Sequence, residues 1–240
     1  MTKSMMAGVL TMVMLAGGGQ QAFAQGSESK VFASLEFGAQ VTQRTVASST
    51  SFPLYDETAT VSTSQPVHNG PIFGGSLGYR VTPNFGLAVG VTMFNAREGE
   101  SSVVASIPDL VVYNQPKTVV ATATGLKHTQ LGLHLQATWF QPVTDKLELV
   151  LAAGPSLIKV SHDVATASVV TGTQNISTVS ASQSGNAFGF NAGGEANYRL
   201  SSSVLAGIFV RYVAATTDLT DVPDLKVGGL QTGLGLRLRF

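Results

Sequence analysis

Apolar and polar residues alternate with a period of two along most of the chain, and this pattern predicts β-strands with two different faces. In the first run Val31, Leu35 and Phe37 are apolar, whereas Glu36 and Gln40 have the opposite parity. The alternation recurs seven more times, over residues 73–81, 85–93, 130–139, 147–153, 188–199, 204–212 and 230–240. We expect Pro155 to end the fifth strand or to force a bulge in it.

The connections between these runs alternate in length. Those at 82–84, 141–146 and 200–203 are short, whereas those at 48–69, 97–124, 161–184 and 213–226 are long. Strict alternation is expected when all short turns lie at one end of a membrane barrel and all long loops lie at the other. We therefore predict an all-β fold, an eight-stranded antiparallel up-and-down transmembrane β-barrel.

Aromatic residues on the apolar parity indicate that this face meets lipid. They fall either near the short turns or near the long loops, and two aromatic girdles that flank an aliphatic band are typical of the two membrane interfaces. A soluble lipocalin-like barrel is the alternative, and it would turn its apolar face inward around a ligand. The predicted girdle residues are Phe73, Tyr79, Phe85, Trp139, Phe188, Tyr198 and Tyr212.

The opposite parity carries the charged residues that would point into the barrel. We predict a luminal charge network, because an isolated buried charge is costly unless it is paired. Two interpretations stay open: a salt-bridged plug that leaves the barrel impermeable, or a narrow pore in which the excess of arginine favours anions. The predicted network comprises Glu36, Arg80, Glu148, Glu195, Arg199, Arg211, Arg237 and Arg239.

Composition supports a membrane location. Only 12% of the residues are charged, and the mean hydropathy is +0.23, whereas a soluble domain has about 25% charged residues. The formal net charge of +0 argues against a nucleic-acid partner. The absence of cysteine excludes disulfides and thiolate metal sites.

The amino terminus has the features of a secretory signal peptide. Lys3 precedes an apolar stretch at 7–19, and Ala22-Phe23-Ala24 is a small-residue cleavage site. We predict a signal peptide over 1–24 that is cleaved after Ala24, and a barrel domain over 25–240. A retained membrane anchor is the alternative, although the apolar stretch is short for one.

The last strand ends in Leu236-Arg237-Leu238-Arg239-Phe240. Together with the signal peptide and the eight strands, this ending resembles the small outer-membrane β-barrel proteins of Gram-negative bacteria, of the OmpA or OmpX kind. The resemblance implies a location in the outer membrane, among lipid and lipopolysaccharide. It also implies that Leu236, Leu238 and Phe240 form an assembly signal for the barrel-assembly machinery.

Candidate chemistry is sparse, and we predict no catalytic, cofactor-binding or metal-binding residues. His128 and His134 share the inward parity, whereas His68 and His162 fall in long loops, where Asp163 could orient His162 near His128. None of the histidines lies in the His-x-Ser arrangement that lipid A deacylases have.

The long loops are rich in Ser, Thr, Val and Ala. They either continue as strands with an exposed edge for an extracellular protein partner, or remain mobile and polar. The predicted function is a structural or cell-surface interaction role. The alternatives are a narrow porin-like channel and a lipid A-modifying enzyme.

Overall fold

The computed structural model describes residues 30–97, 100–170, 175–220 and 222–240. The chain divides into two compact units, Met1–Lys30 and Val31–Phe240, and the strands described below belong to the second. The predicted signal peptide at 1–24 lies outside the described residues. No helix in the described part of the chain is long and apolar enough to cross a membrane.

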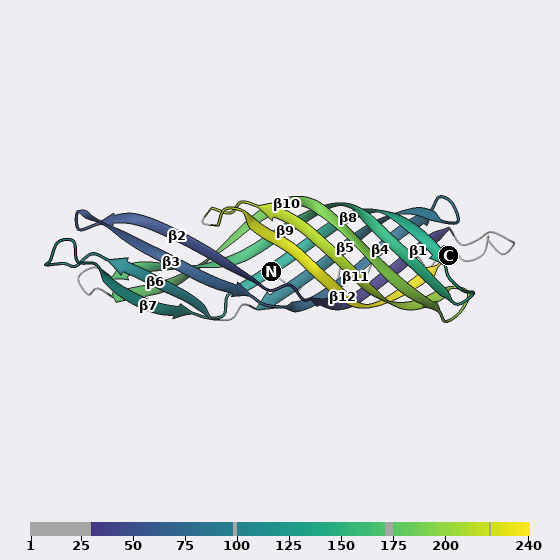
Figure 1. Ribbon diagram of the computed structural model, residues 1–240, viewed down its shortest axis with the longest axis horizontal. Helices are drawn as coiled ribbons and strands as arrows, with labels where there is room; N and C mark the ends of the chain where they lie inside the picture. Colours follow the sequence, from purple (N-terminus) through teal and green to yellow (C-terminus); the bar gives the residue numbers. More distant parts are fainter. Residues whose placement is uncertain (1–29, 98–99, 171–174, 221) are drawn as a thin grey trace. The chain divides into compact units, whose positions relative to one another are not determined.

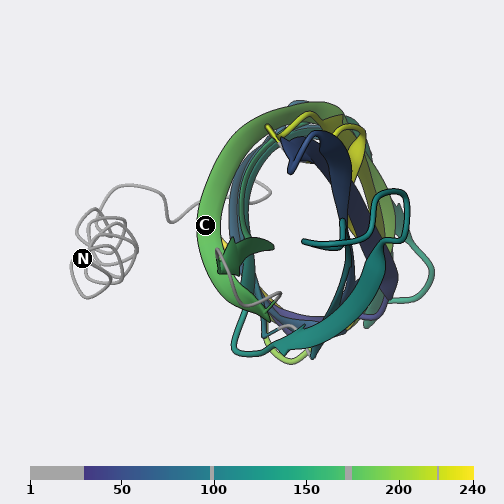
Figure 2. The ribbon, with the colours of Figure 1, turned by 90° about the vertical axis from the view of Figure 1, so that its left-hand side faces the viewer.

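The predicted barrel is confirmed: within the described residues, eight antiparallel strands close into a ring (Figures 1 and 2). Their order around the ring is β1-β12-β11-β10-β9-β8-β5-β4, and the backbone N–H of Phe240 donates to Val31 O at 2.9 Å where β12 meets β1. The barrel strands are β1 (Val31–Gln40), β4 (Gly70–Arg80), β5 (Phe85–Arg97), β8 (Lys127–Pro142), β9 (Leu147–Val170), β10 (Asn175–Arg199), β11 (Val204–Thr217) and β12 (Leu225–Arg239).

The first two long connections contain a second sheet. Its strands pair in the order β2-β3-β6-β7, and they lie at the long-loop end of the barrel (Figure 1). Tyr55 and Asp56, between the first two of these strands, have φ values of 52° and 60°, and two positive φ values in succession are typical of the type I′ turn of a hairpin. The strands are β2 (Arg44–Leu54), β3 (Glu57–Val67), β6 (Ser101–Ile107) and β7 (Lys117–Ala123).

Pro155 does not end β9 and does not force a bulge, but the pairing of β9 with β8 is interrupted at residues 154 and 155. The register between β8 and β9 is the same on both sides of the proline, from His134 opposite Ser156 to Ala137 opposite Ala153. Proline lacks the N–H that the ladder requires. Beside the proline, the Nδ2 of Asn191 on β10 donates to the backbone oxygen of Gly154 at 2.8 Å, so this carbonyl has a partner. The strand therefore continues to Val170, and His162 lies within it rather than in a loop.

The interior at the long-loop end is apolar, whereas the parity of the strands predicts a small and polar lumen. Here side chains from β9, β11 and β12 pack against side chains from β2, β3 and the last long connection. Burial of this apolar surface stabilises the barrel. The buried members of this apolar plug are Val46, Val67, Ile158, Val160, Val164, Ala187, Val213, Leu219, Val222, Leu225 and Val227.

Gly154 is a position where only glycine fits without distortion. A Cβ atom at residue 154 would lie 1.9 Å from the backbone oxygen of Leu135 on β8, whereas the nearest atom to a Cβ at Gly235 would be 3.7 Å away. We expect Gly154→Ala to lower the free energy of unfolding by about 1–3 kcal/mol, the usual cost of overpacking. Urea unfolding in lipid vesicles, followed by the fluorescence of Trp139, measures the change. Gly235→Ala is the matched control, and equal unfolding midpoints for the two variants would contradict the prediction.

Candidate functional site

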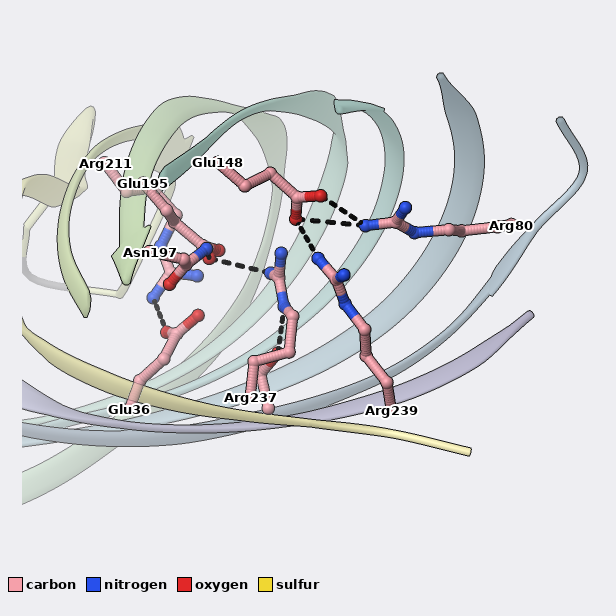
Figure 3. A network of polar contacts seen from close by, with 9 residues as sticks. Glu36, Arg80, Glu148, Glu195, Asn197, Arg211, Arg237 and Arg239 are labelled. Carbon is pink, nitrogen blue, oxygen red and sulfur yellow. Dashed lines mark hydrogen bonds and ion pairs between the residues drawn. The ribbon is translucent and has the colours of Figure 1, made fainter. Parts of the chain in front are cut away.

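Glu148 joins two arginines at the short-turn end of the lumen (Figure 3). Arg80 is the last residue of β4 and Arg239 the last of β12, and both face Glu148 near the start of β9. Arg80 Nη2 donates to Glu148 Oε2 at 2.8 Å and to Oε1 at 3.0 Å, and Arg239 Nη2 also donates to Oε1. One carboxylate is thus shared by two guanidinium groups.

Two further carboxylates have one arginine each. Arg211 Nη2 donates to Glu36 Oε2 at 2.7 Å, and Arg237 Nη2 donates to Glu195 Oε2 at 2.7 Å. Neutral side chains complete both pairs: the Nε of Arg211 donates to Gln231, and the Nε of Arg237 donates to Ser34. The structure therefore brings together seven of the eight charged residues that the parity selects (Figure 3).

Arg199 is the exception among these residues. It is the last residue of β10 and is exposed, and it has no ion pair among the described residues. Arg199 has the inward parity of β10. Because the strand ends at this residue, however, the barrel wall does not enclose its side chain. Arg199 is still close enough to Arg239 to interact with it electrostatically.

An aromatic pair lies beneath the arginines, and the sequence pattern did not single it out. The guanidinium carbon of Arg80 is 3.8 Å from the ring centroid of Phe140, and that of Arg237 is 4.9 Å from the ring of Phe32. The two rings contact each other edge to face, with centroids 5.4 Å apart. Cations over aromatic faces are stabilised by the ring quadrupole. Both phenylalanines have the inward parity of their strands, which is the signal that could have identified them.

Histidines occupy the lumen farther from the short turns. His134 is buried, and its two ring nitrogens lie 2.8 Å from Thr92 Oγ1 and 2.8 Å from Ser156 Oγ. Because hydroxyl groups hold both nitrogens, no carboxylate orients this imidazole. The site therefore has a serine beside a histidine but lacks the acid of a catalytic triad.

A pair of histidines, one from β8 and one from β9, lies farther along the barrel. The Nδ1 atoms of His128 and His162 are 3.0 Å apart, and both side chains are buried. Asp163 does not orient His162, because its Oδ2 accepts the backbone N–H of Lys127 at 3.1 Å. His128 approaches His162, as the sequence suggests, but both residues lie in barrel strands rather than in a loop.

The predicted girdle residues project outward from the barrel. All seven are exposed, and β4 and β10 each carry one girdle residue near the short turns and one near the long loops. In the last strand, Leu236 and Phe240 are exposed and Leu238 is partly buried, so the terminal apolar residues also face outward. The exposed girdle residues are Phe73, Tyr79, Phe85, Trp139, Phe188, Tyr198 and Tyr212.

A family model described as the outer membrane protein beta-barrel domain matches residues 10–237. The chain belongs to this family. It is therefore a transmembrane β-barrel of the outer membrane, as the resemblance implied.

Three solved structures of outer-membrane barrels are also similar to this chain. Neisserial surface protein A is 15% identical, with coverage of 88% of this chain and 97% of that chain and a TM-score of 0.48. OprG from Pseudomonas aeruginosa is 12% identical, with coverage of 90% and 98% and a TM-score of 0.47. Ail of Yersinia pestis is 15% identical, with coverage of 89% and 100% and a TM-score of 0.38. Among curated proteins, none matches.

Loss of the shared carboxylate should destabilise the barrel more than loss of a carboxylate with one partner. Glu148→Gln leaves two arginines without a counter-charge, and breaking a buried ion pair in this way costs about 3–5 kcal/mol. Only one guanidinium loses its counter-charge in Glu195→Gln, and the Glu195 side chain is 20% exposed whereas that of Glu148 is 7% exposed, so a smaller loss is expected. Urea unfolding of both variants in vesicles tests the order. The explanation fails if Glu148→Gln unfolds at the same urea concentration as the unsubstituted protein.

Proposed function

We propose that this outer-membrane barrel is a cell-surface interaction protein with a closed lumen. The observation that carries the proposal is the sheet β2-β3-β6-β7, which occupies the long-loop end of the barrel. In this proposal the short turns face the periplasm and the sheet faces the outside. The girdle residues then lie at the two headgroup regions, among lipid and lipopolysaccharide.

Export and assembly complete the proposal. Residues 1–24 serve as the signal peptide, cleavage after Ala24 releases the barrel domain over 25–240, and Leu236, Leu238 and Phe240 present the last strand to the barrel-assembly machinery. The outward direction of Leu236 and Phe240 supports this role, because a recognition signal has to be accessible from outside the barrel wall.

The outer sheet has a core of its own, which supports a role as a fixed binding surface. Gln65 Nε2 donates to Asp163 O at 2.8 Å, and Thr63 Oγ1 donates to Ala165 O at 3.2 Å, so β3 is attached to β9. Apolar side chains of the sheet also pack against the extended β9–β10 hairpin. The buried members of this cluster are Val61, Val103, Ala105, Ile107, Ala123, Leu126 and Ala165.

The tip of the β6–β7 connection presents apolar side chains to solvent on an ordered backbone. Val111 is 88% exposed and Tyr113 is 76% exposed. Asp109 Oδ1 accepts the backbone N–H of Val111 at 2.8 Å, and Glu57 Oε1 accepts that of Asn114 at 3.0 Å, so the tips of the two hairpins are connected. Exposed apolar groups on a pre-organised surface are typical of protein interaction sites.

The edge strands offer a second mode of contact with an extracellular protein partner. Among the described strands β2 pairs only with β3, so its outer edge has backbone groups available to a strand from another chain. Its Ser and Thr residues also keep this edge polar.

The lumen supports the closed alternative over the porin-like one. The ion pairs around Glu36, Glu148 and Glu195 cross the interior at one end, and the apolar plug fills the other. An eight-stranded barrel is only wide enough for such side chains. Catalysis is not part of the proposal, nor is a cofactor or a nucleic-acid partner.

Polar substitutions at the tip of the β6–β7 connection should weaken the attachment of cells that display the protein. Cells of a Gram-negative host that display the protein are compared for binding to immobilised extracellular matrix proteins and to animal-cell monolayers. We expect Val111→Ser with Tyr113→Ser to reduce attachment several-fold, because the apolar contact area is lost. Val143→Ser, which changes an exposed valine in a short turn, is the matched control and should have no effect. Equal attachment by all three strains, or none by cells that display folded barrel, would contradict the proposal.

A further inference from the structure

The charges of the lumen are not evenly balanced along its length. Glu36 with Arg211 and Glu195 with Arg237 are one-to-one pairs. At the short-turn mouth, in contrast, Arg80 and Arg239 share the single carboxylate of Glu148, and Arg199 lies at the rim, where its backbone N–H donates to Lys146 O at 2.7 Å. The ion pairs of Glu148 therefore leave one surplus positive charge at this mouth, and Arg199 adds a second.

These arginines also have more donors than the protein uses. A guanidinium group has five N–H donors, yet both Arg80 and Arg239 bond to Glu148 through Nη2 alone. Their Nε atoms are buried and have no hydrogen-bond partner in the described structure. A buried donor without a partner is costly, so a conformation in which an anion accepts from these groups is favoured.

The mouth is also accessible from the aqueous side. The side chain of Arg80 is 15% exposed, that of Arg239 is 9% exposed, and Arg199 lies at the rim. Asp145 and Lys146 in the adjacent turn cancel each other's charge.

We propose that the short-turn mouth of the lumen is a binding site for a small soluble oxyanion of the phosphate class, formed by Arg80, Arg199 and Arg239. The planar fork of arginine matches phosphate oxygens in two-point contacts. Glu148 holds two of the three guanidinium groups in place, and Arg199 approaches the anion from the rim. With the orientation proposed above, the ligand comes from the periplasm, and the site does not depend on the surface interaction.

Phosphate binding to the whole barrel tests this site. The protein is refolded in a nonionic detergent that contains no phosphate, and inorganic phosphate replaces chloride at constant ionic strength. Calorimetric titration should give saturable binding. Arg199→Gln should weaken it about tenfold, since the loss of one hydrogen bond to a charged group corresponds to such a factor. Arg239→Gln should abolish phosphate binding. If the Arg239→Gln protein does not fold, the Arg199→Gln variant still tests the site.

Lys226→Gln is the matched control, because it removes an exposed cation at the opposite end of the barrel. It should bind phosphate as the unsubstituted protein does. Three results would overturn the proposal: no saturable binding, equal weakening by Lys226→Gln and Arg199→Gln, or unchanged binding in Arg199→Gln. A parallel titration with vesicles of an anionic phospholipid identifies the source of the phosphate. If the protein binds the vesicles in an Arg199-dependent manner but does not bind inorganic phosphate, the ligand is a lipid headgroup and the proposal of a soluble ligand is wrong.

Discussion

A charge that points into an eight-stranded barrel must find a partner there, because side chains rather than water fill so narrow an interior. The ion pairs of Glu36, Glu148 and Glu195 satisfy this constraint by crossing the lumen. Each joins strands that are not neighbours in the sheet, such as β4 with β9 and β1 with β11. The network therefore braces the ring from within, in addition to the backbone ladders that close it.

The interior changes character along the barrel axis. Charged pairs over an aromatic floor occupy the short-turn end, hydrogen-bonded histidines and amides follow, and the apolar plug fills the long-loop end. Val46 on β2 and Val67 on β3 belong to this plug, so the outer sheet begins where the barrel core ends. The packing of this plug thus supports the surface that we propose for interaction.

The period-two pattern was sufficient to predict the barrel, because each strand has one face toward lipid and one toward the lumen. It also selected the charged residues that the structure brings together, with the exception of Arg199 at a strand end. The continuation of β9 past Pro155 could not be predicted, since Asn191, whose side chain donates to Gly154 O beside the proline, comes from another strand. The apolar plug could not be predicted either, because Val46 and Leu219 reach it from connections whose direction depends on tertiary packing.

We infer that two independent features close the lumen, the ion pairs at one end and the apolar plug at the other. Single-channel conductance of the refolded barrel in a planar bilayer, after a heat-modifiable gel band has confirmed folding, tests it most directly. We expect no conductance steps from the unsubstituted protein. The variants Glu195→Ala and Arg237→Ala, which each disrupt one ion pair, should also give no steps, because the apolar plug remains. Reproducible salt-dependent steps from the unsubstituted protein, altered by either substitution, would contradict the account and identify the lumen as a narrow channel.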